Sequence, residues 1–433
     1  MNKKYNPFKI NEIIFKKESG CRELIPDTFH QIGILYVAFK SLYRIFRRIA
    51  SSVLSSPKIN FKELYDNKLL FVLPTVNNQR ALQKVIDIVK SKKDNIRVAT
   101  QNFYSELYVA IMSLPYLPIF WYEYCKLTTE KKILASYYLE QFVFTSGVVR
   151  FYFKILKKCR PECVVLSNDH VYITKSLELV CEDLGIKTIY VQHASVAYDF
   201  PELHFAYSFL DGQDSLLKYT ADGKKSTGNV IMLGAARYDS LSSYRINKKT
   251  HKRNCIGIAI NSLDDNKIVN DFCNHVLSKY PDVKIKIRSH PALKNKPFKF
   301  DNSKRIIYTC ATDEAMLEYL DSIDFQVSGD SGVHLDAIIG GINTVVYNLS
   351  KNIFSDNYQY VKSGLVKYVE NVEQIFEFAN CNPDISLVRF YDESYQKTYS
   401  GKCSEIIAEF ITEGYNLDVL KRYNLEIIKQ NNA

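Results

Sequence analysis

Short apolar strands alternate with helical segments along most of this chain, and this alternation is the feature that most restricts the fold. Leu69–Leu73 is predicted to be a buried strand, Arg80–Val89 a helix and Ile96–Thr100 the next strand. This order forms a βαβ unit, which is typical of parallel α/β sheets. Further strands are predicted at Cys163–Leu166, Lys187–Val191, Phe205–Phe209, Val230–Leu233, Ile256–Ile260, Val283–Ile287, Arg305–Tyr308, Ile323–Val327 and Thr344–Tyr347.

The chain is long enough for two such sheets. Its 433 residues exceed what one core usually supports, and the polar stretch Ser242–Arg253 separates the strands into two sets. We therefore expect an α/β fold with two Rossmann-like domains that face a central cleft. The predicted parts are a basic amphipathic segment at 1–62, a first domain at 63–245, a second domain at 246–400, and helices at 401–433 that pack back on the first domain.

Two polar motifs in the second domain follow apolar strands. In the first motif, Arg288, Ser289 and His290 come at the end of an alternating strand, and Pro291 ends that strand. In the second motif, a turn of small residues leads from a strand into a helical run, and its residues are Ser328, Gly329, Asp330, Ser331 and Gly332. Ligands of open parallel sheets bind at such strand ends, so we expect the two motifs to act together.

The chemistry of these motifs suits a phosphate group. A glycine-containing turn that opens a helix offers backbone N–H groups and the positive end of the helix dipole. Arg288 and His290 add donors, and Asp336, one turn into the helix, is a candidate for a ribose hydroxyl. The alternative is an ordinary helix cap formed by a serine or aspartate. We favour the phosphate site because the two motifs occur at successive strand ends.

The first domain carries its own polar strand ends. Asp169 and His170 follow Cys163–Leu166, while Gln192 and His193 follow Lys187–Val191. Asp169 or His193 could serve as a general base, with His170 and Gln192 on the same side. Alternatively, Asp169 caps the following helix and His193 is a hydrogen-bonded interior residue.

The excess of basic residues lies near the amino end. The formal net charge is +10, and residues 1–60 hold eleven Lys and Arg against four Asp and Glu. Because the rest of the chain is nearly balanced, nucleic acid is not an expected partner. The segment Thr28–Ser56 predicts an amphipathic helix, with a basic side at Lys40, Arg44, Arg47 and Arg48 and an apolar side at Phe39, Leu42, Ile45, Phe46 and Ile49. Such a helix can lie on an anionic membrane or pack on the protein body.

A second apolar stretch, Leu107–Cys125, approaches the length that spans a bilayer. It contains Pro115, Pro118 and Glu123, which favour a core or interfacial helix over a spanning one. We assign it to the side of the protein that meets the acceptor. The ten cysteines show no metal-binding spacing and no acidic cluster stands out, so we expect no metal site.

These motifs resemble those of bacterial GT-B glycosyltransferases that assemble surface polysaccharides. The closest likeness is to sialyltransferases and related transferases of nonulosonic acids or Kdo, whose His-Pro and Ser-Ser/Thr motifs hold the phosphate of CMP. By resemblance, His290 and Pro291 match the first motif, and Ser328 with Ser331 match the second. The family's motif of two carboxylates and a glycine has its nearest equivalents at Asn168-Asp169-His170 and Asp211-Gly212.

The resemblance implies a nucleotide-sugar-dependent glycosyltransferase of two GT-B-like domains. The first domain would bind the acceptor, an oligosaccharide or lipid-linked glycan. The second would bind the donor, a CMP-activated nonulosonic acid or Kdo or, failing that, a UDP or GDP sugar. No cofactor or metal is expected, and the expected location is the cytoplasm or the inner face of the cytoplasmic membrane. Three alternatives stay open: a CDP-glycerol or CDP-ribitol phosphotransferase, which the resemblance also covers, a non-catalytic scaffold that binds saccharides, and a GT-B-like sugar-nucleotide epimerase.

Overall fold

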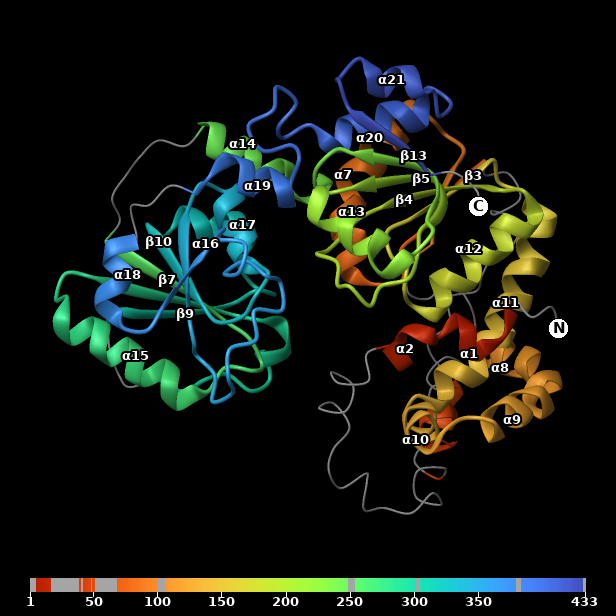
Figure 1. The fold of residues 1–433 in the computed structure, drawn as a ribbon, viewed down its shortest axis with the longest axis horizontal. Coiled ribbons are helices and arrows are strands. Elements are labelled where there is room, and N and C mark those ends of the chain that lie inside the picture. Colours follow the sequence, from red (N-terminus) through yellow and green to blue (C-terminus); the bar gives the residue numbers. More distant parts are fainter. Residues whose placement is uncertain are drawn as a thin grey trace. The chain divides into compact units, whose positions relative to one another are not determined.

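The computed structural model describes residues 5–16, 39, 42–47, 49–50, 68–99, 106–247, 254–300, 304–378 and 383–430. The chain folds into two compact units. Unit 1 comprises Met1–Leu210, Leu216–Ile231 and Ile407–Ala433, and unit 2 comprises Asp211–Ser215 and Met232–Ile406. Each unit is built around one β-sheet that is flanked by helices (Figure 1).

Unit 1 contains a seven-stranded sheet in the order β13-β6-β5-β4-β3-β1-β2. The five strands from β5 to β2 pair in parallel, and every residue of β1 and β3 is buried. The strands are β1 (Leu69–Val72), β2 (Ile96–Ala99), β3 (Cys163–Leu166), β4 (Lys187–Val191), β5 (His204–Leu210), β6 (Thr227–Met232) and β13 (Glu426–Gln430).

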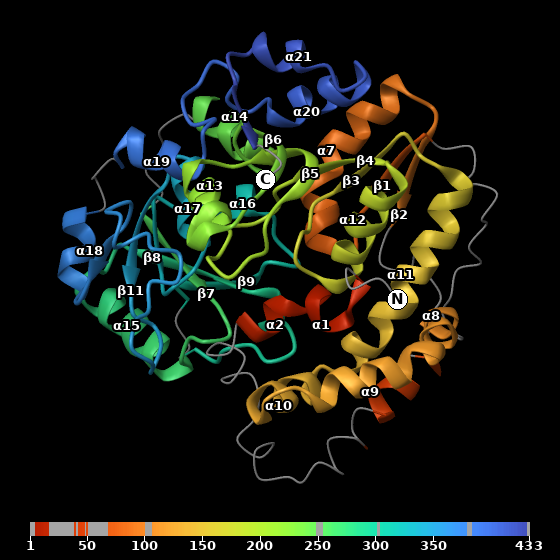
Figure 2. The same cartoon turned by 45° about the vertical axis from the view of Figure 1, so that its right-hand side comes forward.

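The helices of unit 1 include a group that stands apart from the sheet. α8 (Glu106–Ser113), η2 (Leu114–Tyr116), α9 (Leu117–Cys125) and α10 (Thr129–Tyr137) gather around the long α11 (Leu139–Cys159), as Figure 2 shows. The short helices α1 (Pro7–Ile10) and α2 (Glu12–Lys16) pack on this group through Phe8 and Ile14. The remaining helices are α7 (Val76–Lys92), α12 (Tyr172–Leu184), α13 (Gln213–Thr220), η3 (Ala221–Gly223), α20 (Cys403–Thr412) and α21 (Leu417–Lys421), of which α13 and α20 cross the unit boundaries.

Unit 2 contains a six-stranded sheet in the order β12-β11-β10-β7-β8-β9, and every neighbouring pair is parallel. Its strands are β7 (Cys255–Ile260), β8 (Lys284–Ser289), β9 (Ile306–Cys310), β10 (Phe325–Ser328), β11 (Asn343–Tyr347) and β12 (Lys367–Val369). Its helices are η4 (Ala236–Tyr238), α14 (Asp239–Asn247), α15 (Asn266–Lys279), η5 (Pro291–Leu293), α16 (Met316–Asp321), α17 (Val333–Ile339), α18 (Val372–Phe378) and α19 (Ile385–Tyr391).

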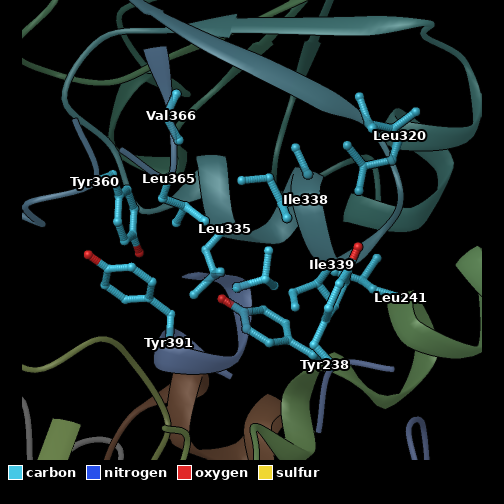
Figure 3. Close-up of a cluster of buried hydrophobic side chains, with 14 of the residues drawn as sticks. Tyr238, Leu241, Leu320, Leu335, Ile338, Ile339, Tyr360, Leu365, Val366 and Tyr391 are labelled. Carbon is cyan, nitrogen blue, oxygen red and sulfur yellow. The ribbon is translucent and has the colours of Figure 1, made fainter. Parts of the chain in front are cut away.

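Two apolar clusters hold the helices of unit 2 against its sheet. One cluster includes Phe272 and Val276 of α15 with Ile375 of α18. The other holds α17, whose Leu335, Ile338 and Ile339 pack among side chains of α14, α16, α19 and neighbouring loops (Figure 3). This packing fixes the position of α17, which directly follows the turn at the end of β10.

The predicted fold class is confirmed: the chain is an α/β protein with two Rossmann-like units. The central cleft stays a prediction. Sequence patterns missed β12 and β13, which have three and five residues and lie at sheet edges. Residues 407–433 belong to unit 1, where β13 joins the sheet.

The predicted basic helix at Thr28–Ser56 lies largely outside the described residues. Residues 42–47 are helical, and Arg44 donates a hydrogen bond of 3.1 Å to the carbonyl oxygen of Tyr137. Phe39, Leu42 and Phe46 of the predicted apolar side are exposed. Among the residues that the structure describes, no helix is both long enough and apolar enough to cross a bilayer.

Candidate functional site

Three polar strand ends meet at the carboxyl edge of the sheet in unit 2. β7 is central, with β10 on one side and β8 on the other, and these strands continue into Asn261, Gly329 and His290. β8 and β9 follow β7 on one side of the sheet, and β10, the next strand in the sequence, lies on the other side of β7. The point where the strand order reverses is where parallel sheets bind their ligands.

His334 fixes the turn that follows β10. Its side chain is buried, with Nε2 2.9 Å from the carbonyl oxygen of Gly329 and Nδ1 2.7 Å from Oγ1 of Thr344. Burial lowers the pKa of His334 to about 4, so the ring is neutral at pH 7 and donates from Nε2. Because the C=O and N–H of a trans peptide point in opposite directions, the N–H of Asp330 points away from His334. The sequence motifs assigned no role to this histidine.

The turn offers hydrogen-bond donors to a ligand. In the described part of the chain, the backbone N–H groups of Asp330 and Ser331 have no acceptor. The Ser331 hydroxyl oxygen accepts from the N–H of Val333 at 3.4 Å, which leaves its hydrogen available. Consecutive N–H groups in a turn form a concavity that suits an anion. α17 itself has only seven residues, so we give its amino end no separate role.

Two residues predicted to bind phosphate instead form hydrogen bonds within the protein. Ser328 is fully buried and its hydroxyl donates to the carbonyl oxygen of Ala259 at 2.7 Å, so it joins β10 to β7. The carboxylate of Asp330 accepts from the Ser355 hydroxyl at 2.9 Å and from the backbone N–H of Asn357 at 3.0 Å. Asp330 therefore fastens a neighbouring loop, and we retain only its N–H as a phosphate donor.

His290 presents one ring nitrogen to solvent. Its Nδ1 accepts from the N–H of Ala292 at 3.1 Å, and Pro291 begins η5 directly afterwards. Since Nδ1 accepts, the ring proton is on Nε2. Burial, and then the charge of Arg288, lower the pKa of His290. At neutral pH the side chain is therefore a neutral donor at the end of β8.

Asp264 is a further group near the turn that sequence reasoning missed. It follows β7, and its Oδ2 accepts from the N–H of Asn261 at 2.7 Å. A Cβ placed on Gly329 would lie 2.9 Å from Oδ1 of Asp264, so only glycine permits this approach. Burial raises the pKa of Asp264 to about 6. In the sequence, the only sign of Asp264 is a polar loop after a buried strand, the same pattern as in the motifs at 288–291 and 328–332.

We expect Asp264→Asn to strengthen nucleotide binding at pH 8. A bound phosphate raises the pKa of Asp264 further. Nucleotide binding by the wild type therefore weakens as the pH rises through 6, and it becomes constant once Asp264 is ionised both in the free protein and in the complex. Removing one charge near the phosphate should increase affinity about fivefold at pH 8 and change little at pH 5. Titration calorimetry of both proteins at the two pH values tests this. Equal affinities at pH 8 would show that Asp264 lies too far from the ligand.

Arg288 and Asp336 have partners within unit 2. Arg288 packs over the ring of Tyr319 and donates to the carbonyl oxygen of Glu314 at 3.3 Å. Burial raises the pKa of Asp336, although Tyr238, Arg237 and Arg288 favour its charged form. Arg288 and Asp336 thus both have polar neighbours in the interior of unit 2. Their predicted contacts with a nucleotide stay predictions.

In unit 1, Asp169 and His170 form a hydrogen-bonded pair at the end of β3. β3 lies beside β1 at the point where the strand order of this sheet reverses. Asp169 is buried and accepts from Nδ1 of His170 at 3.0 Å and from the Tyr219 hydroxyl at 2.7 Å. Burial raises the pKa of Asp169, but His170 and Tyr219 outweigh this and hold it below the usual value. The carboxylate is ionised, so Nδ1 of His170 carries a proton and donates it to Asp169.

This pair lines a hollow of about 270 Å³. His170 is partly exposed, and its ring lies 4.3 Å from that of Phe200. Other residues lining the hollow are Lys9, Glu12, Lys16, Lys175, Asp199, Glu202 and His204. His170, and not the buried Asp169, is therefore the group that reaches solvent in this hollow.

The remaining predicted residues of unit 1 lie at the ends of β3 and β4. Asp169 does not cap α12, which begins after Val171 without a side-chain cap. In the turn before this helix, Oδ1 of Asn168 accepts from the N–H groups of His170 and Val171 at 3.2 and 3.0 Å. Gln192 is buried and donates to the carbonyl oxygen of Ala194 at 2.9 Å. His193 is half-buried after β4, and its predicted role as a base stays a prediction. Asp211, the other carboxylate considered, is buried in unit 2 and paired with Arg237 at 2.6 Å.

Within the described residues, no group of three or more His, Cys, Asp and Glu side chains could hold a metal ion. No protein-family model matches the chain, and no curated protein matches its sequence.

The chain is similar to several solved structures. One is the UDP-GlcNAc 2-epimerase of Methanocaldococcus jannaschii, with 17% identity, a TM-score of 0.49, and coverage of 80% of this chain and 99% of that one. Another is the UDP-GlcNAc 2-epimerase of Neisseria meningitidis bound to UDP-GlcNAc, with 15% identity, a TM-score of 0.48, and coverage of 80% and 100%. The spinosyn rhamnosyltransferase SpnG in complex with spinosyn aglycone has 11% identity, a TM-score of 0.39, and coverage of 82% and 99%. Similarity at this level concerns the course of the backbone and does not extend to a reaction.

Proposed function

We propose that the protein is a glycosyltransferase that uses a nucleotide-activated sugar. The observation that carries the proposal is the turn after β10 in unit 2. In the described part of the chain, the N–H groups of Asp330 and Ser331 have no acceptor, and they lie at the sheet edge where β8 continues into His290. These are neutral donors, which suit a phosphate that gains charge as the sugar leaves. The His-Pro pair and the serine turn support a CMP-activated nonulosonic acid or Kdo as the donor.

The proposed reaction divides between the two units. The bond between the anomeric carbon and the phosphate oxygen breaks, and its electron pair stays on the nucleotide. His290 and the turn at Ser331 would stabilise this leaving group. An acceptor hydroxyl forms the new bond to the anomeric carbon and gives its proton to Nε2 of His170, which Asp169 orients. We propose a saccharide or lipid-linked glycan as the acceptor.

Titration calorimetry with CMP, CDP, UDP and GDP, with and without magnesium, tests the donor assignment. Preferential CMP binding that does not depend on magnesium would support a nonulosonate or Kdo transferase. Preference for CDP would instead favour the phosphotransferase, and UDP or GDP would favour a hexose transferase. The absence of binding to all four would contradict the proposal and favour a scaffold.

We expect His290→Asn to weaken CMP binding about tenfold, since a hydrogen bond to a charged phosphate contributes roughly 1.5–3 kcal/mol. Asparagine keeps an oxygen that can accept from the N–H of Ala292, so η5 should persist. The matched control is His275→Asn, on the exposed side of α15 in the same unit. Equal CMP affinity in the two variants, with unchanged thermal unfolding, would remove His290 from the site.

A further inference from the structure

The helices α8, η2 and α9 of unit 1 expose an apolar surface. We name it the apolar helical surface, and it consists of Leu107, Ile111, Leu114, Leu117, Ile119, Trp121 and Tyr122. Trp121 is 63% exposed, Leu114 58% and Ile111 56%, values that are unusual for such large side chains. Soluble proteins rarely expose apolar side chains in contiguous groups unless something binds there.

The opposite sides of the same helices are firmly packed, so the exposure is not a sign of loose structure. Val109 and Ser113 of α8 are buried against α11, where a Cβ on Gly147 would lie only 2.0 Å from the Val109 carbonyl oxygen. Phe120 of α9 stacks on Phe8 with 5.3 Å between ring centroids. The packed sides of α8 and α9, which lie beside α11 (Figure 2), therefore give the apolar helical surface a fixed support.

Basic side chains lie next to the aromatic rings of these helices. The ammonium group of Lys126 is 3.7 Å from the ring centroid of Tyr122, Arg150 lies 5.4 Å from that of Tyr116, and Lys154 lies 5.4 Å from that of Tyr108. Residues 106–160 contain eight Lys and Arg against four Asp and Glu. Aromatic rings bordered by cations are typical of surfaces that lie at the boundary between lipid tails and headgroups.

We propose that the apolar helical surface docks on an anionic lipid bilayer, with Trp121 and Leu114 among the acyl chains and Lys126 and Arg150 at the headgroups. The charge favours this partner, because two copies of the chain would bring their cations together, whereas anionic lipid attracts them. Elsewhere in unit 1, exposed Phe39, Leu42 and Phe46 add apolar groups of the same kind, on a segment whose Arg44 donates to the carbonyl oxygen of Tyr137. The inference does not depend on the proposed glycosyl transfer.

The single tryptophan of the chain is Trp121, and it provides a direct test. Vesicles of phosphatidylcholine with phosphatidylglycerol are added to the full-length protein, and the emission is recorded. We expect a blue shift, and quenching by lipids brominated on their acyl chains, because the indole leaves water for the bilayer. An unchanged spectrum would overturn the proposal, whether or not the protein sediments with the vesicles.

Variants that keep Trp121 as the fluorescent reporter test the other residues of the apolar helical surface and its basic border. Ile111→Ser with Leu114→Ser should lower the vesicle partition coefficient at least about tenfold, given the apolar area removed. The matched control is Ile246→Ser with Ile353→Ser, two exposed isoleucines of unit 2, which should bind like the wild type. Lys126→Glu should weaken binding to anionic vesicles about fivefold or more and leave binding to phosphatidylcholine alone unchanged. A blue shift that appears with protein concentration in the absence of lipid, and is lost in the Ile111/Leu114 variant, would mean that a second copy covers the surface and would overturn the proposal.

Discussion

Replacing His170 by asparagine is expected to lower kcat about 10²–10⁴-fold, the usual contribution of a positioned general base. The reason is geometric: Asp169 holds Nδ1–H, so Nε2 is the basic atom of the pair, and the side chain reaches a hollow in unit 1. The affinity for the donor nucleotide should not change, because the proposed phosphate site is in unit 2. A CMP-sugar turnover assay and CMP calorimetry on the same preparation separate the two effects.

His204→Asn is the matched control for this variant, since His204 lines the same hollow but pairs with Glu202 and Thr227. We expect it to retain turnover. Tyr219→Phe removes one of the two hydrogen bonds to Asp169 and should lower kcat less than the loss of His170 does. If His170→Asn and His204→Asn had equal turnover, the base would have to be sought elsewhere, with His193 as the next candidate.

The sheets could be predicted because parallel strands are short, apolar and regularly spaced. Cys163–Leu166 and Lys187–Val191 were predicted with the bounds that the structure has, and other strands differ by one to three residues at an end. Polar residues at strand ends were likewise predictable, because all carboxyl ends of a parallel sheet lie on one edge.

The sequence could not predict which of these polar groups face outward. Ser328 and Ser331 look alike in the sequence, yet one is buried against β7 and the other lies at the surface of the turn. Arg288 precedes His290 by two residues, but its side chain turns along the sheet toward Tyr319. Such differences depend on neighbours that are distant in the sequence, as does the contact of Asp169 with Tyr219.

Replacing Asp211 by alanine is expected to destabilise unit 2 by about 3–5 kcal/mol, because it removes the carboxylate that is hydrogen-bonded to the buried guanidinium of Arg237. Asp211 is nearly inaccessible, and its Oδ2 lies 2.6 Å from Nη2 of Arg237. The neighbouring Gly212 is equally constrained, since a Cβ there would lie 2.6 Å from the carbonyl oxygen of Phe390. Both observations indicate that the Asp211-Gly212 pair maintains the fold.

Urea unfolding measures this effect, with Asp313→Ala as the control. Asp313 pairs with Lys294 at 3.0 Å on the surface of the same unit, and its removal should cost less than about 1 kcal/mol. The double variant Asp211→Leu with Arg237→Met should recover much of the loss, because apolar groups can replace a buried ion pair. If Asp211→Ala instead kept full stability and lost only turnover, Asp211 would act as the acceptor base, and His170 would need another role.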